Sequence, residues 1–179
     1  VEVVEADIHS PQVLGSLASG CSAVINLVGI LHGRGGHPYG ADFARAHVEL
    51  PRQLAVACNT AGGRRILHMS ALGADGEAPL PSMYLRSKAD GEREIMQSGL
   101  DWTLFRPSVV FGPEDRFLNL FASLQRFAPV MPLARAQTRF QPIHVDDVAQ
   151  AFINALGNPA TIGRAYELAG PRVYTFREL

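Results

Sequence analysis

The fold is decided by two apolar runs, AVINLV at residues 23–28 and RILHM at residues 65–69. Between them lie a glycine-rich loop at residues 29–40 and a helical pattern over residues 42–59. Short runs that are continuously apolar and rich in β-branched residues are typical of parallel strands covered on both faces. The segment therefore predicts one strand–helix–strand unit of a parallel sheet.

The same alternation continues on both sides of this unit. Upstream, residues 1–4 predict a strand, and Ser10 followed by Pro11 predicts the start of a short helix. Downstream, the sequence predicts a helix at 81–97, a strand at 102–106, a helix at 116–127, a strand at 140–143, a helix at 146–156 and a strand at 165–168. Strands that alternate with helices predict an α/β fold with a doubly wound parallel sheet, which binds ligands at the carboxyl ends of its strands.

The composition excludes several classes of function. The chain has 179 residues, of which 47% are hydrophobic, and its formal net charge is −1. No basic patch is present that could neutralise phosphates, so a nucleic-acid partner is not expected. The longest apolar run, residues 23–31, is too short to span a bilayer. Cys21 and Cys58 lack metal-ligand spacing and predict buried free thiols of a reducing compartment.

The strongest chemical signal is the pair Tyr84 and Lys88. A spacing of four residues places both side chains on one face of a helix, where a cation lowers the pKa of a phenol toward the range of proton transfer. A simple surface pair is the alternative. Lys88 is the only lysine among the 16 Lys and Arg residues, which favours a site that needs a compact ammonium group. Ser70 ends the preceding strand, where its hydroxyl can share a substrate oxygen with Tyr84.

These residues resemble the extended short-chain dehydrogenase/reductase family, in which Tyr-x-x-x-Lys follows a strand that ends in Ser. Arg106-Pro107-Ser108 after the next strand adds to the resemblance. Two longer motifs, YLRSKADGE at 84–92 and FGPEDRFLN at 111–119, resemble the NAD(P)H-binding accessory subunits of respiratory complex I and their bacterial relatives. The resemblance implies an NAD(P)-binding, Rossmann-like core over residues 1–112 and small substrate-side segments over residues 113–179.

The resemblance also assigns cofactor contacts by position. It implies that Asp7 and Ile8 bind the adenine, that Lys88 binds the nicotinamide ribose, and that Pro107 and Val110 lie against the nicotinamide. The strand end that runs along the cofactor is Leu27, Val28 and Gly29. The implied cofactor is NADP or NAD, and the choice stays open because the deciding residues would precede Val1.

The implied catalytic residues are Tyr84 as acid and base, Lys88 as its partner and Ser70 as the group that polarises the substrate oxygen. If the family's serine aligns with Ala71 instead, this set is incomplete. His47 stands where many relatives have an asparagine whose main-chain carbonyl holds a water. Pro51 lacks the N–H that would pair with the His47 carbonyl, which predicts either the same water relay or a packing kink.

The chain departs from the family at its beginning. The strand–helix–strand with the glycine-rich turn that cradles a pyrophosphate would precede Val1, and residues 175–179 predict the first turn of another helix, so we expect a fragment of a longer protein. Residues 33–36, Gly-Arg-Gly-Gly, follow the wrong strand and predict a plain loop. His144 with Asp146 and Asp147 predicts a helix N-cap rather than a metal site.

Two functions follow from these expectations. The first is an oxidoreductase or epimerase-like enzyme that uses Tyr84 and Lys88. The second is a non-catalytic NAD(P)H-binding accessory or assembly protein of the respiratory NADH:quinone oxidoreductase, with a respiratory-chain complex or a quinone-related partner. The resemblance implies a cytoplasmic protein, peripheral on the inner face of the cytoplasmic or mitochondrial inner membrane.

Overall fold

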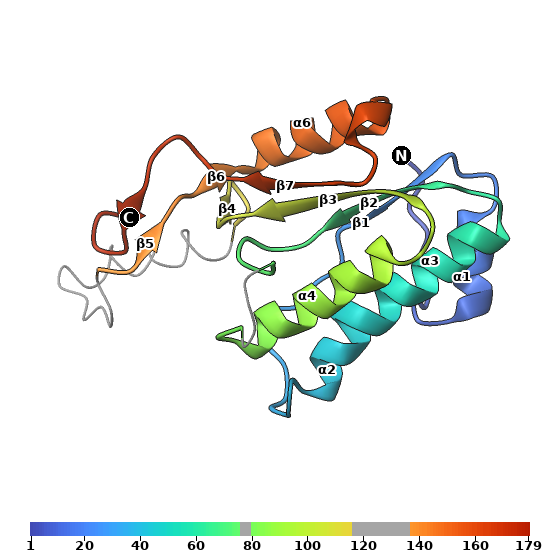
Figure 1. The fold of residues 1–179 in the computed structure, drawn as a ribbon, viewed down its shortest axis with the longest axis horizontal. Coiled ribbons are helices and arrows are strands. Elements are labelled where there is room, and N and C mark those ends of the chain that lie inside the picture. The colour runs from blue at the N-terminus through green and yellow to red at the C-terminus, as the bar shows by residue number, and fades with distance from the viewer. Residues whose placement is uncertain (76–79, 116–136) are drawn as a thin grey trace. The chain divides into compact units, whose positions relative to one another are not determined.

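A computed structural model of the chain describes residues 1–75, 80–115 and 137–179. Its main sheet has four strands in the order β1-β2-β3-β7 (Figure 1). The strands are β1 (Ala23–Asn26), β2 (Arg65–Met69), β3 (Asp101–Pro107) and β7 (Arg164–Leu168). Both β1–β2 and β2–β3 pair in parallel, with Ala23 beside Arg65 and Arg65 beside Asp101. The predicted α/β fold with a parallel sheet is confirmed.

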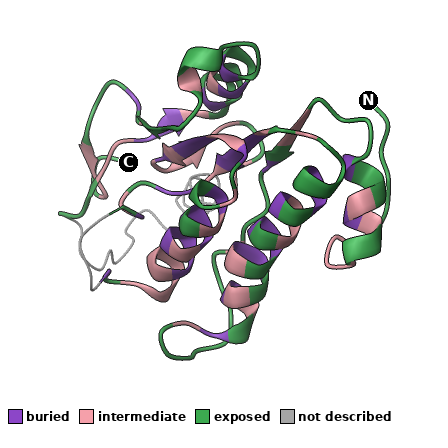
Figure 2. Ribbon diagram, turned by 45° about the vertical axis from the view of Figure 1, so that its right-hand side comes forward, coloured by how far each residue is buried: buried purple, intermediate pink, exposed green. Residues whose placement is uncertain are grey.

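Three helices lie together against one face of β1, β2 and β3 (Figure 1). They are α1 (Pro11–Ala18), α3 (Leu50–Thr60) and α4 (Met83–Met96). Ile66 and Leu104 from the sheet are fully buried in one apolar cluster with Cys58 of α3 and Ile95 of α4. Figure 2 shows buried residues alternating with partly buried and exposed ones along α3 and α4.

The helix predicted at 42–59 has an irregular centre. It consists of α2 (Ala41–Ala44), a π-helical turn η1 (Arg45–Glu49) and α3 (Leu50–Thr60). The Leu50 N–H donates to the Arg45 carbonyl, five residues back, and Pro51 follows at once. A π-helical turn is a single-turn insertion that is frequent at functional sites.

The chain divides into two compact units. The first comprises Val1–Arg106 and Ala155–Tyr166, and the second comprises Pro107–Asn154 and Glu167–Leu179. In the second unit, β4 (Val110–Phe111) pairs in parallel with β6 (Ile143–His144), and β5 (Arg139–Phe140) pairs antiparallel with β8 (Tyr174–Thr175). The last helix is α6 (Val145–Leu156), and a 3₁₀ turn η2 (Pro159–Thr161) follows it.

Several sequence expectations need correction. Residues 1–4 form no strand, because the described sheet has no strand that hydrogen-bonds to them, and β1 at its edge ends at Asn26 instead of Val28. Ile25 of this edge strand is 41% exposed, so β1 is not covered on both faces. Cys21 is exposed, whereas Cys58 is buried as expected. The helix predicted at 116–127 lies outside the described residues.

Candidate functional site

Lys88 lies at the centre of the candidate site. Its side chain is buried, and its Nζ donates a hydrogen bond of 2.6 Å to the carbonyl of Met69, the last residue of β2. Burial lowers the pKa of Lys88 to about 8, and the negative charge of Glu92, one turn further along α4, partly opposes this. The single lysine of the chain is therefore an internal ammonium group at the end of a strand, rather than half of a surface pair.

Tyr84 occupies the first turn of α4, one turn before Lys88. The N-terminus of the helix is set by Ser82, whose hydroxyl accepts a hydrogen bond from the Leu85 N–H. Burial raises the pKa of the Tyr84 phenol. The net shift is opposite to the one expected from the neighbouring cation, because removal of the ring from water favours the neutral form. The phenol is thus protonated in this state.

Ser70 directly follows β2, next to the carbonyl that Lys88 binds. Its N–H donates to the Phe105 carbonyl at 2.7 Å, which continues the β2–β3 pairing by one residue. Its hydroxyl is buried and has no hydrogen-bond partner within the described residues. A buried hydroxyl without a partner is costly, so this group needs a ligand or a water to satisfy it. Ala71 is buried as well and offers no such group.

The segment after β1 presents an open main-chain surface. Leu27 is 56% exposed and Val28 is 37% exposed. A methyl group placed on Gly29 would lie 3.6 Å from His47 Nε2 and 3.9 Å from Lys88 Nζ, which are ordinary contact distances. Gly29 therefore lies directly beside the buried ammonium group without being crowded by it, and other atoms can approach its backbone closely.

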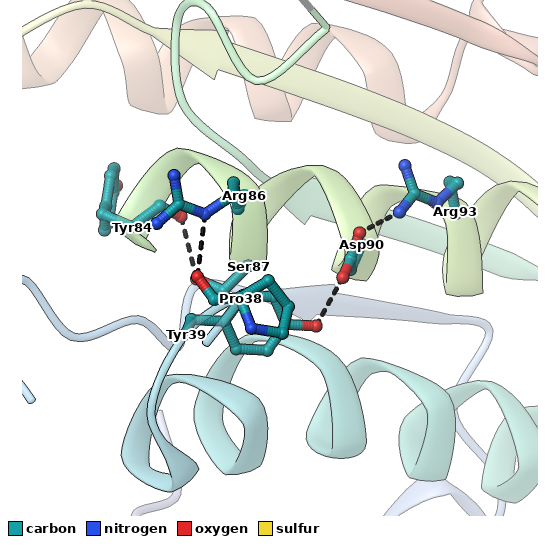
Figure 3. Close-up of polar contacts among 7 residues, drawn as sticks. All are labelled: Pro38, Tyr39, Tyr84, Arg86, Ser87, Asp90 and Arg93. Atoms are coloured by element: carbon teal, nitrogen blue, oxygen red, sulfur yellow. Dashed lines mark hydrogen bonds and ion pairs between the residues drawn. The ribbon is translucent and has the colours of Figure 1, made fainter. Parts of the chain in front are cut away.

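His47 joins this segment to α4. Its ring is 1% exposed, its Nε2 accepts a hydrogen bond of 3.0 Å from the Ile30 N–H, and its Nδ1 lies 2.8 Å from Ser87 Oγ. Ser87 Oγ in turn donates to the Tyr84 carbonyl at 2.8 Å (Figure 3). Because Nε2 is the acceptor, the proton of the neutral imidazole belongs on Nδ1. Burial, followed by the charge of Lys88, lowers the pKa of His47 to about 4.

The main-chain carbonyl of His47 lies against the backbone of α4. A methyl group on Gly91 of α4 would lie 1.9 Å from the His47 oxygen and 3.7 Å from Pro51 Cγ. The carbonyl thus meets the backbone of α4 at its one glycine, a geometry that suits a weak Cα–H···O contact. This favours the packing kink over the water relay.

A second histidine, His68 of β2, is buried beside these groups. Asn26 Oδ1 accepts from the Val28 N–H at 3.1 Å, so its Nδ2 donates to His68 Nδ1 at 2.9 Å. The remaining proton of His68 then lies on Nε2, which is buried and lacks a partner in the described part of the chain. Burial holds the pKa of His68 well below its usual range.

A buried ion pair joins Arg106 to Glu92, one turn after Lys88 on α4. It was not predicted from the sequence. Arg106 at the end of β3 donates to both carboxylate oxygens of Glu92, at 2.9 and 2.6 Å, and also to Asp75 at 2.6 Å. Glu92 is 2% exposed. The only sequence signal for it is the spacing of four residues from Lys88 to Glu92, which repeats the spacing from Tyr84 to Lys88.

The glycine-rich loop is fastened to the helices around Tyr84. Arg86 of α4 donates to the Pro38 carbonyl and to the Leu80 carbonyl, both at 2.8 Å. The Tyr39 hydroxyl donates to Asp90, which also pairs with Arg93 (Figure 3). Within residues 33–36, the main-chain N–H and the guanidinium of Arg34 donate to the Asp42 carboxylate at 2.8 to 3.1 Å.

The remaining sequence candidates are more dispersed. Asp7 is exposed and accepts a hydrogen bond from the His9 N–H, and Ile8 packs against the cluster of α1 and α3. Pro107 and Val110 belong to the second unit.

The metal-site candidates also lie in the second unit. His144 and Asp146 form a contact of 3.5 Å at the start of α6, where Asp146 and Asp147 lie in the first turn instead of at the N-cap. The described residues contain no group of three or more potential metal ligands.

Comparison with known proteins decides the family. A family model described as NAD(P)H-binding matches residues 1–159. The chain belongs to the NAD(P)H-binding family. The fold is shown by its similarity to a solved structure of MoeE5 in complex with UDP-glucose and NAD. The TM-score is 0.82 at 21% identity, and the match covers 98% of this chain and 65% of that chain. The chain is thus an NAD(P)-binding, short-chain dehydrogenase/reductase-like domain.

Two curated relatives cover most of this chain. The rat protein NADH dehydrogenase [ubiquinone] 1 alpha subcomplex subunit 9, mitochondrial, is 40% identical over 155 residues, which cover 86% of this chain and 39% of the relative. The ceramide reductase of Caulobacter vibrioides is 32% identical over 157 residues, which cover 86% of this chain and 46% of the relative. The chain thus spans less than half the length of these relatives. Among its described helices, none has both the length and the apolar character needed to cross a membrane.

The residues around Lys88 fit part of a dinucleotide. A buried ammonium group suits ribose hydroxyls, the open backbone at Gly29 suits close approach, and the unpartnered Ser70 hydroxyl needs an acceptor or donor. Lys88, Gly29, Tyr84 and Ser70 are accordingly the candidate residues of this site.

Proposed function

We propose that this domain belongs to an NAD(P)H-dependent oxidoreductase that reduces a carbonyl group, with Tyr84 as proton donor. The observation that supports this most directly is the position of Lys88. Its Nζ contacts the end of β2 next to Ser70 and lies beside Gly29, and its helix carries Tyr84 one turn earlier. A single buried cation thus connects the three segments that the family resemblance assigns to cofactor and substrate.

Each residue has a defined task in the proposed reaction. NADH or NADPH supplies a hydride to the carbonyl carbon when it is bound. The Tyr84 hydroxyl donates its proton to the carbonyl oxygen, and Lys88 stabilises the phenolate that remains. The Ser70 hydroxyl donates a hydrogen bond to the same oxygen. The raised pKa of Tyr84 keeps the phenol protonated for this direction of the reaction.

The domain organisation remains part of the proposal. Residues 1–112 would form the cofactor-binding core, and residues 113–179 would supply the substrate side. In support, the first compact unit contains the whole stretch Val1–Arg106, with Lys88, Tyr84 and Ser70, and it also takes in Ala155–Tyr166. The extended sequence FGPEDRFLN begins at residue 111, within the second unit.

The identity with the rat subunit supports a second candidate function. In that case the domain binds NADH or NADPH without turnover, as an accessory or assembly protein of a respiratory NADH:quinone oxidoreductase. The partner would be a respiratory-chain complex or a quinone-related component. The protein would then lie in the cytoplasm or the mitochondrial matrix, peripheral on the inner face of the membrane.

The substitution Tyr84→Phe separates the two candidates. The full-length protein is titrated with NADH and NADPH by calorimetry, and dinucleotide oxidation is followed with a panel of ketones and aldehydes. An enzyme loses at least about 100-fold in turnover when the proton donor is removed, while its dinucleotide affinity is preserved. Tyr166→Phe, a matched change at an exposed tyrosine, serves as the control. Equal activity of wild type and Tyr84→Phe would contradict the enzyme assignment.

A further inference from the structure

Among the described residues, His47 is the one side chain that hydrogen-bonds both to the segment after β1 and to the helix that carries Tyr84 and Lys88. Its Nε2 holds the Ile30 N–H, and its Nδ1 reaches the Tyr84 carbonyl through Ser87 Oγ. These hydrogen bonds form a relay from Ile30 through His47 and Ser87 to Tyr84. The direction of each bond in the relay follows from the Ile30 N–H, which can only donate. Leucine or phenylalanine could fill the same volume, but neither could make either bond.

The ring is also fixed by packing. Its centroid lies 5.6 Å from that of Phe43, and Tyr84 packs against it edge-on with a centroid distance of 5.5 Å. The titratable groups that face it are Tyr84 and Lys88 of α4 and His68 of β2. A positive imidazole would have to share this buried space with the Lys88 ammonium group, which favours the neutral ring.

We propose that His47, with its proton on Nδ1, is a positioning residue that holds the Gly29–Ile30 backbone and the Tyr84 end of α4 in the arrangement that receives the dinucleotide. The inference rests on the proposed function and extends it to a buried residue outside the set Tyr84, Lys88 and Ser70. A methyl group on Gly29 would lie 3.6 Å from His47 Nε2. The same methyl group would lie 3.9 Å from Lys88 Nζ. The histidine therefore sets how far the open backbone of Gly29 stands from the buried ammonium group.

This arrangement lowers the cost of binding. Without the imidazole, the Ile30 N–H would lose its acceptor, and the segment after β1 would have to be ordered by the ligand itself. Ser87→Ala cuts only the branch toward Tyr84, because the bond to Ile30 remains. The two branches can therefore be tested separately.

The test uses the full-length protein with His47→Leu, His47→Gln and Ser87→Ala, titrated with NADH and NADPH by calorimetry. We expect His47→Leu to weaken binding about tenfold, which corresponds to the loss of about one hydrogen bond. His47→Gln keeps an acceptor and a donor and should recover most of the affinity, and Ser87→Ala should bind nearly as wild type does. Ile95→Ala, which removes a buried side chain away from the relay, controls for general loss of stability.

The imidazole itself gives a second readout. Nitrogen-15 chemical shifts of the unliganded protein report which ring nitrogen carries the proton. We expect a neutral ring protonated on Nδ1 at pH about 6, where an ordinary histidine is largely charged. A ring protonated on Nε2, or a charged ring at that pH, would overturn the inference. So would His47→Leu binding with wild-type affinity, whereas a wild-type protein that binds neither dinucleotide would instead overturn the proposed function.

Discussion

Replacing Gly91 with alanine would place a methyl group where the His47 carbonyl already lies. The new Cβ would be 1.9 Å from the His47 oxygen and 3.1 Å from the His47 carbonyl carbon. Both atoms belong to the backbone of the π-helical turn, so no side-chain rotation can relieve the overlap. The helices α3 and α4 would have to move apart, and the apolar cluster that they share with the sheet would loosen.

The size of the effect follows from two opposing contributions. Overpacking of this kind costs about 1–3 kcal/mol, and a backbone obstacle places Gly91→Ala near the upper end. The better helix propensity of alanine returns up to about 1 kcal/mol. A net loss of about 2 kcal/mol lowers the melting temperature of a domain of this size by about 4–8 °C.

The measurement is thermal unfolding of the full-length protein, followed by circular dichroism. Gly15→Ala in α1 is the matched control, because a methyl group there would meet nothing within 4 Å. It should gain about 0.5–1 kcal/mol from helix propensity alone. If Gly91→Ala melts at or above the wild-type temperature, the close contact between the His47 carbonyl and α4 does not exist.

Three further predictions concern charged and titratable groups. Arg106→Met leaves Glu92 buried without its partner and should lower the free energy of unfolding, measured with denaturant, by about 3–5 kcal/mol. The double change Arg106→Met/Glu92→Leu should recover most of that loss. Equal stability of the single and double variants would contradict this. Because the pKa of Lys88 is lowered to about 8, dinucleotide affinity measured by calorimetry should weaken as pH rises through about 8, while Lys88→Met should bind weakly at every pH. The pKa of His47 is lowered to about 4 from the ordinary 6.5, so the folded state binds fewer protons than the unfolded state between these values. Wild-type stability should therefore fall as pH drops from 6.5 toward 4, and a denaturant series on His47→Gln should show a shallower fall.

The sequence predicts the regular part of the fold well because apolar periodicity dominates there. Residues 65–69 are β2, and the turn glycines Gly62 and Gly99 adopt positive φ values of 75° after α3 and α4. The strand predicted at residues 1–4 is wrong because a strand depends on a hydrogen-bonded neighbour, which local sequence cannot supply. The only sequence signal for the π-helical turn is Pro51, which predicts an irregularity in the helix. It does not predict that the irregularity is a π-helical turn at Arg45–Glu49.

The candidate site was predicted by residue type but not by environment. The spacing of Tyr84 and Lys88 predicts one shared face, and the structure places both on α4. The direction of the Tyr84 pKa shift depends on burial, which spacing does not reveal. The roles of Glu92 and of the His47 side chain depend on partners far away in sequence, Arg106 and Ile30.

The central claim is that NADH or NADPH binds along Gly29 and Lys88. The most direct test is a calorimetric titration of the full-length wild type, Gly29→Ala and Gly35→Ala with both dinucleotides. An alanine at Gly29 makes only ordinary contacts in the free protein, and one at Gly35 of the same loop makes none within 4 Å, so both variants should fold normally. We predict wild-type binding, unchanged binding for Gly35→Ala and at least about tenfold weaker binding for Gly29→Ala, because the methyl group blocks close approach to the backbone. Absent binding in the wild type, or equal binding by all three proteins, would contradict the account.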